Sequence, residues 1–278
     1  MVAKIPVFQK RITTVQIAER VSAPKTRVAT FQDSTRPVKV RRGNCLSSNL
    51  RNLTPMFGTE PTPFDVRLNV FRIPVRVHPS FWIVTALLNW DADRLDLVFI
   101  WVMCLFVSVL VHELGHALIA EAFGWRSHIV LYWCGGLAYS ERYFNRSHWR
   151  DIAVSLAGPF AGFGLFFVTL TLHLLLPAQL VTFNPYLEFI LSSLIVINLF
   201  WGLVNLLPVL PLDGGQVSQS LLAILRVRSP DRLARQISVL FAGVAAIVFF
   251  SVLHMRFGGV LFAMLCLQNI MELQSPRH

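Results

Sequence analysis

The apolar run LVFIWVMCLFVSVLV at residues 97–111 continues without a break into HELGH at 112–116 and ALIA at 117–120. About 20 apolar residues are enough for a helix to cross the hydrocarbon of a bilayer. A charged group at that depth costs roughly 2.5–3.5 kcal/mol on insertion scales. The stretch therefore predicts a transmembrane helix whose polar residues serve a function that offsets their cost.

The spacing of these polar residues indicates a metal site. Positions i and i+4 of a helix lie one above the other on the same face, so the imidazoles of His112 and His116 can hold one Zn²⁺ between them. The adjacent Glu113 can take the proton of a zinc-activated water. We interpret the motif as a candidate intramembrane metal hydrolase site with one zinc ion per chain.

The composition also indicates a membrane protein. Of the 278 residues, 54% are hydrophobic and only 14% are charged, and the mean hydropathy is +0.57. Residues 1–76 hold 14 Lys and Arg against 4 Asp and Glu, which accounts for the whole net charge of +10. The remainder is neutral. A basic tail on a neutral core predicts contact with a lipid bilayer and not the binding of nucleic acid.

Six apolar segments are predicted to cross or enter the membrane, and a seventh at residues 217–225 is too short to cross and is predicted to be a packed helix. The six are residues 79–90, 95–123, 152–176, 186–207, 236–253 and 257–270. The runs at 127–133 and 137–142 flank Cys134-Gly135-Gly136 and predict a β-hairpin at the interface. The expected fold is therefore an all-α polytopic membrane protein with about six transmembrane helices and one small hairpin.

Residues 1–70 are predicted to be a basic, disordered N-terminal tail, 71–272 the membrane domain, and 273–278 a C-terminal tail. The first 60 residues lack the apolar region of a secretory signal peptide. Three interpretations stay open for them: a cytoplasmic tail that contacts anionic lipid, a mistaken start site or lineage-specific extension, or an organellar transit peptide.

The arginines of the short loops predict the orientation. Residues 124–150 and 226–235 contain four arginines each, whereas the intervening loops contain one or none. The positive-inside rule then puts both termini in the cytoplasm. His112 follows Leu95 by 17 residues, about 26 Å along a helix, so the site is expected near the cytoplasmic side.

A third ligand is expected from the sequence NLLPVLPLDGG at residues 205–215. Its two prolines end the preceding helix, and Gly214-Gly215 are predicted to allow a tight turn. Asp213 then opens the next helical stretch at a depth similar to that of His112. Three protein ligands and one open position are the pattern of a catalytic zinc site.

HExxH followed downstream by NxxPxxxLDGG resembles the site-2 protease family of intramembrane zinc metalloproteases, peptidase family M50, and most of all its compact bacterial type related to the sporulation factor protease. The resemblance covers roughly residues 70–272 and includes VHPSF at 77–81. At AGPFAG, residues 157–162, the family often has Asn where this chain has Gly162.

The resemblance implies that His112, His116 and Asp213 bind zinc, that Glu113 is the general base, and that Asn205 lies beside the scissile carbonyl. It also implies transmembrane protein substrates, cut near the cytoplasmic side, and a multi-pass location in the bacterial inner membrane.

Two other classes of protein compete with this interpretation. A scaffold or metal-dependent binding protein could keep zinc without turnover, but it would need no base such as Glu113 beside the ligands. A transporter also places His and Asp in the membrane, but the two halves of this chain show no internal repeat. No sequence feature fixes an oligomeric state.

The predicted hairpin has two interpretations. Its edge could pair with an unwound substrate strand. Alternatively, it could be an interfacial element anchored among headgroups by Trp125, Tyr132 and Trp133.

Overall fold

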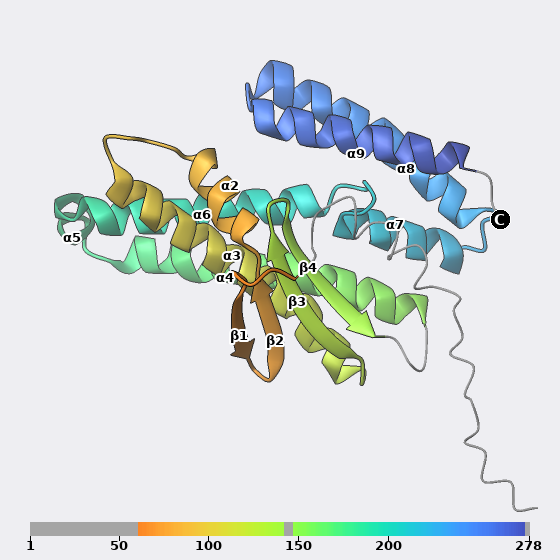
Figure 1. The fold of residues 1–278 in the computed structure, drawn as a ribbon, viewed down its shortest axis with the longest axis horizontal. Coiled ribbons are helices and arrows are strands. Elements are labelled where there is room, and N and C mark those ends of the chain that lie inside the picture. The colour runs from red at the N-terminus through yellow and green to blue at the C-terminus, as the bar shows by residue number, and fades with distance from the viewer. Residues whose placement is uncertain (1–60, 142–146, 276–278) are drawn as a thin grey trace, which may run out of the picture. The chain divides into compact units, whose positions relative to one another are not determined.

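The computed structural model describes residues 61–141 and 147–275, and most of these are helical (Figure 1). The first 60 residues of the predicted tail lie outside the described residues, as do 276–278 of the predicted C-terminal tail.

Among the described residues, five helices are long and apolar enough to cross a membrane. They match the last five predicted segments and confirm a polytopic helical membrane protein. They are α3 (Leu95–Ala122), α4 (His148–Leu175), α6 (Pro185–Asn205), α8 (Pro230–Ile247, continued by the π-helical turn η1, Val248–Val252) and α9 (Arg256–Gln274).

The first predicted segment is shorter than expected. Its helix, α2, spans only Pro79–Leu88, about 15 Å, which is half of the hydrocarbon thickness. The helix begins where the His78 ring nitrogen Nδ1 accepts a hydrogen bond from the Ser80 backbone N–H at 3.1 Å. Proline at position 79 suits the first turn, which needs no N–H of its own. Two further short helices, α5 (Ala178–Phe183) and α7 (Asp213–Ile224), complete the helical part.

The predicted hairpin is present but belongs to a larger sheet. Its strands β3 (Arg126–Tyr132) and β4 (Gly135–Glu141) pair antiparallel. Two strands that the sequence analysis missed, β1 (Val66–Val70) and β2 (Ile73–Val77), extend it in the order β1-β2-β3-β4. Strands β2 and β3 pair in parallel, with α2 and α3 in the connection between them. Strand β1 thus lies within residues expected to belong to the disordered tail.

One face of this sheet packs against α3. Strand β2 alternates, with Ile73, Val75 and Val77 buried and the residues between them more exposed, as a strand with one covered face requires. The buried residues of this core are Ile73, Val75, Val77, Phe81, Cys104, Leu105, Val109, Leu114, Ala117, Ile129, Leu131 and Ile197. The sheet therefore lies directly beside the helix that carries HELGH.

Helix α4 also packs closely against α3 because both helices have glycine at the contact. A Cβ atom added to Gly115 would lie 2.8 Å from Cβ of Ala161, closer than real Cβ atoms approach. Helix α4 further packs against α6 and α7. It is therefore the element that joins the HELGH helix to the helix that begins at Asp213.

Candidate metal centre

Helix α3 supplies three buried polar side chains from one turn and a half. His112, Glu113 and His116 are 2%, 5% and 7% exposed. The two imidazole rings lie on the same face, edge to face, with Nε2 of His116 at 3.2 Å from Nε2 of His112. The i, i+4 spacing thus brings the two ring nitrogens together as predicted.

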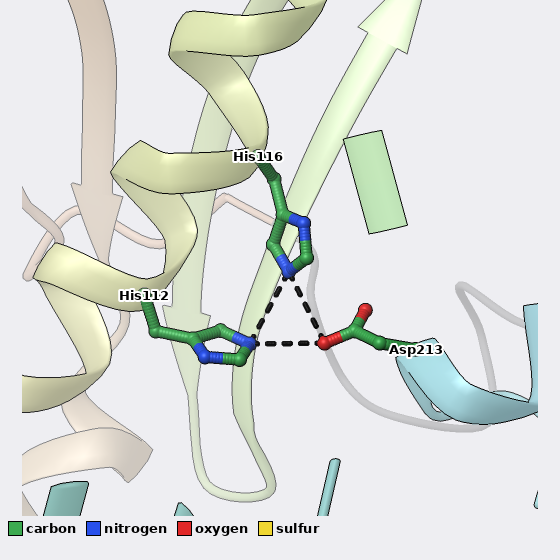
Figure 2. Close-up of side chains that lie close together, drawn as sticks. All are labelled: His112, His116 and Asp213. Atoms are coloured by element: carbon green, nitrogen blue, oxygen red, sulfur yellow. Dashed lines mark hydrogen bonds and ion pairs between the residues drawn. The ribbon is translucent and has the colours of Figure 1, made fainter. Parts of the chain in front are cut away.

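Asp213 completes the group from a distant part of the chain. Its Oδ2 atom lies 3.1 Å from Nε2 of His112 and 3.3 Å from Nε2 of His116. Figure 2 shows the two rings and the carboxylate converging on one point from α3 and from the start of α7. Of the described residues, these are the ones whose His, Cys, Asp and Glu ligand atoms form a group fit for a metal ion.

The path from α6 to Asp213 follows the local sequence. Helix α6 ends at Asn205, just before the segment that contains Pro208 and Pro211. The two glycines after Asp213 are helical, and neither has a positive φ. Their role is close packing and not the tight turn that we predicted. A Cβ atom on Gly215 would lie 2.5 Å from the backbone N of Leu210, so only glycine lets α7 pack directly on the preceding loop.

The orientation of His116 is fixed by a backbone group. Its Nδ1 atom lies 2.7 Å from the carbonyl oxygen of Val154 in α4, and since a carbonyl can only accept, Nδ1–H is the donor. In the neutral imidazole that hydrogen bond leaves Nε2 without a proton and directed toward Asp213, the arrangement that a metal-binding imidazole needs. Gly158 makes this approach possible, because a Cβ atom there would lie 2.7 Å from Cδ2 of the ring and nearer still to Nε2.

The three ligand atoms fit a zinc ion. Ligands at 2.0–2.1 Å from a tetrahedral zinc are separated from one another by about 3.3 Å. The observed separations are 3.2, 3.1 and 3.3 Å. Two nitrogens and one carboxylate oxygen are also a donor set that zinc accepts, and they leave one coordination position open.

Glu113 lies between the metal centre and the sheet. Its carboxylate accepts a hydrogen bond from the backbone N–H of Ala138 in β4. Gly136 contacts the same side chain so closely that a Cβ atom there would lie 2.5 Å from Cδ of Glu113. The strand thus holds the carboxylate in place beside His112 and His116.

The comparison with known families agrees with this geometry. The model of peptidase family M50 matches residues 100–182 and 178–250, together more than half of the chain. The chain belongs to peptidase family M50.

Two curated proteins illustrate how far the similarity of this M50 chain extends. Stage IV sporulation protein FB of Bacillus subtilis is 35% identical over 146 residues, which cover 52% of this chain and 46% of that protein. A zinc metalloprotease of Methanocaldococcus jannaschii is 29% identical over 164 residues, which cover 58% and 46%. The chain spans about half the length of the curated relatives it matches.

A solved structure shares the fold. The site-2 protease from Methanocaldococcus jannaschii is similar with a TM-score of 0.50 at 20% identity, over 77% of this chain and 98% of that one.

The remaining predicted site residue of the M50 chain, Asn205, is not among the clustered ligands. It is the last residue of α6, is half-buried, and donates its side-chain amide to the carbonyl oxygen of Trp201 at 2.9 Å. Its assignment beside a scissile carbonyl stays a prediction.

Sequence reasoning missed three groups that support the site. They are the Val154 carbonyl, the Ala138 N–H and Gly158. The first two are backbone groups and carry no signal in the sequence. Gly158 stands in the sequence as one small residue of AGPFAG, and no local pattern indicates that it packs against a ligand.

Proposed function

We propose that this chain is an intramembrane zinc metalloprotease that hydrolyses peptide bonds in the transmembrane segments of other membrane proteins. The observation that carries the proposal is the buried triangle of His112, His116 and Asp213 with Glu113 beside it. The two histidines and the glutamate lie on α3, a helix long enough to cross a membrane. A structural zinc site would need no carboxylate base next to its ligands. Family membership supports the same conclusion.

Each residue of the site has a separate role in the proposed hydrolysis of a peptide bond. His112, His116 and Asp213 would hold zinc, which when bound polarises a carbonyl and lowers the pKa of water to about 7. Glu113 would accept the proton of the attacking water and pass it to the leaving amine. The Ala138 N–H keeps the Glu113 carboxylate in place for both transfers. Asn205 would donate to the substrate carbonyl; loss of one such donor in another protease costs about 2.7–4 kcal/mol.

The proposed site of cleavage is near the cytoplasmic side of the bacterial inner membrane. Helix α3 runs from Leu95 to Ala122, so His112 lies nearer its end, which leads to the arginine-containing loop. The positive-inside rule puts that loop in the cytoplasm. Strand β2 pairs with β3 of the same loop, which supports an N-terminus on that side. Both termini are then cytoplasmic only if α2 and the residues up to Leu95 together complete a sixth crossing, because α2 is too short to cross alone.

Strand β4 offers a way to bind a substrate after its helix unwinds. It is an edge strand, and the N–H of Ala138 points away from β3 toward Glu113. In an antiparallel pair the outward N–H groups recur at every second residue, so those of Gly136 and Ser140 share this edge. A substrate strand paired along the edge would lie next to the general base.

The substitution Ser140→Pro tests the edge-strand proposal, because it removes one outward N–H without removing a β3–β4 hydrogen bond. Ser140→Ala is its control, since it removes the hydroxyl that contacts Ser127 but keeps the N–H. Cleavage is expected to fall with proline and to persist with alanine. Equal cleavage by both would exclude pairing at this edge.

The experiment that tests the function is co-expression with candidate single-span membrane proteins. Wild type is expected to cut one of them, whereas Glu113→Gln keeps its zinc and leaves the same protein intact. Equal processing by the two would remove Glu113 from the mechanism.

A further inference from the structure

The C-terminal pair of helices contains two buried polar side chains that the proposed mechanism does not use. Ser238 in α8 is 0% exposed and Asn269 in α9 is 1% exposed. Both helices are apolar enough to cross a membrane and run side by side (Figure 1). Polar groups in such surroundings are expensive unless they have a specific partner.

Their common partner is a single residue, Leu210. The Leu210 backbone N–H donates to Oγ of Ser238 at 2.9 Å, and the Leu210 carbonyl oxygen accepts from Nδ2 of Asn269 at 2.7 Å. The residue is therefore held through its N–H by one helix and through its carbonyl by the other.

Leu210 lies close to Asp213 in the sequence and packs against the helix that Asp213 begins. It precedes Asp213 by three residues, and the backbone at Val209 and Leu210 is the surface on which Gly215 packs without room for a Cβ atom. Val209 is fully buried in the apolar cluster formed with α8 and α9. A shift of the Leu210 peptide would therefore move the first turn of α7, which carries the Asp213 carboxylate.

Local helix bonding does not account for these side chains. Each also bonds the carbonyl four residues earlier in its own helix, Ala234 for Ser238 and Leu265 for Asn269. That bond satisfies part of the side chain, but Oδ1 of Asn269 is buried without a partner among the described residues. An apolar residue would avoid that burial, so the benefit of Asn269 must come from its donor to Leu210.

We propose that Ser238 and Asn269 are positioning residues for the zinc ligand Asp213, acting through the Leu210 peptide. The inference rests on the proposed zinc site. It makes the α8–α9 pair part of the metal centre's support, although neither helix contributes a ligand. Removal of a group that is hydrogen-bonded directly to a metal ligand typically changes metal affinity by about 10–100-fold; Ser238 and Asn269 act one step further out, so the lower end of that range is expected.

The test compares variants of the full chain purified in detergent, with Zn²⁺ and Co²⁺ as the probes. Asn269→Leu and Ser238→Ala remove the two contacts with Leu210. Phe262→Leu is a control that weakens the same apolar cluster but leaves both hydrogen bonds to Leu210 in place, and Ser192→Ala removes a hydroxyl that bonds only its own helix. The readouts are zinc affinity by competition with a chelator, the visible spectrum of the Co²⁺ form, and the melting temperature.

We expect Asn269→Leu to weaken zinc binding about tenfold or more and to alter the Co²⁺ spectrum, with a smaller change for Ser238→Ala. Both controls should keep wild-type affinity and spectrum even where the melting temperature falls. If Asn269→Leu matched Phe262→Leu in affinity and spectrum, the two side chains would only be packing, and the inference would be overturned while the zinc site stood. If wild type bound no zinc, both the proposed function and this inference would fall.

Discussion

Gly158 and Gly162, one helical turn apart in α4, should respond in opposite ways to the same substitution. A Cβ atom at Gly158 would lie 2.7 Å from Cδ2 of His116 and nearer to Nε2, whereas one at Gly162 would lie 3.9–4.0 Å from Asn198 and His112. The optimal separation of non-bonded carbon atoms is about 3.5–4.0 Å, so Gly158→Ala must displace the His116 ring by about 1 Å. Metal–ligand distances tolerate about 0.2 Å.

The expected result is that Gly158→Ala loses zinc and, where substrate is available, at least about 100-fold in cleavage, since a misplacement of about 1 Å alone has that effect. Gly162→Ala should keep one zinc per chain and gain up to about 1 kcal/mol of helix stability, because alanine is a better helix former than glycine. Zinc content by elemental analysis and melting temperature in detergent measure both effects.

A double variant separates the contact with His116 from a second effect of Gly158→Ala, which is crowding by the next residue, Pro159. Alanine at 158 precedes Pro159, whose ring crowds the residue before it. The double variant Gly158→Ala/Pro159→Ala relieves that crowding but keeps the contact with His116, so it should still lose zinc. Retention of a full zinc complement by either 158 variant would refute the placement of Gly158 against the ligand.

The other predictions concern the support of Glu113, the sheet and the metal. Gly136→Ala should lower cleavage by about 100-fold with zinc content unchanged, because the added methyl collides with Glu113 and not with a ligand; loss of zinc would count against this reasoning. Burial raises the pKa of Asp65, but hydrogen bonds from Thr62 and the ion pair with Arg76 outweigh it and lower that pKa from 3.8 to about 2. The Thr62 hydrogen bonds and the ion pair with Arg76 should therefore together contribute about 1 kcal/mol above pH 4 and lose it between pH 4 and 2, so melting curves of wild type and Asp65→Asn should converge on acidification. Removal of zinc with a chelator should lower the melting temperature of wild type but not that of Asp213→Ala, because only a chain that binds the ion is stabilised by it.

The metal centre was predictable because its signals are local. HELGH fixes two ligands on one helical face within five residues, and a helix that crosses the membrane needs only an apolar run of sufficient length. Asp213 was predicted from a comparable depth on a second helix, and the structure brings it within 3.3 Å of both rings.

The sheet was only partly predictable because its central pairing is not local. Strand β2 pairs in parallel with β3, although α2 and α3 separate the two strands in the sequence. The run IPVRV at 73–77 contains no feature that indicates a partner strand more than 50 residues away. The short run also lies directly before an apolar segment, which obscured the alternation of a strand. For the same reason the contacts of Glu113 with β4 were not foreseen.

X-ray absorption at the zinc edge of the purified wild-type chain identifies the atoms that surround the ion. We expect one zinc per chain with two imidazole nitrogens and only oxygen besides, all at about 2.0–2.2 Å. A sulfur neighbour at about 2.3 Å, or fewer than two imidazoles, would contradict the site formed by His112, His116 and Asp213.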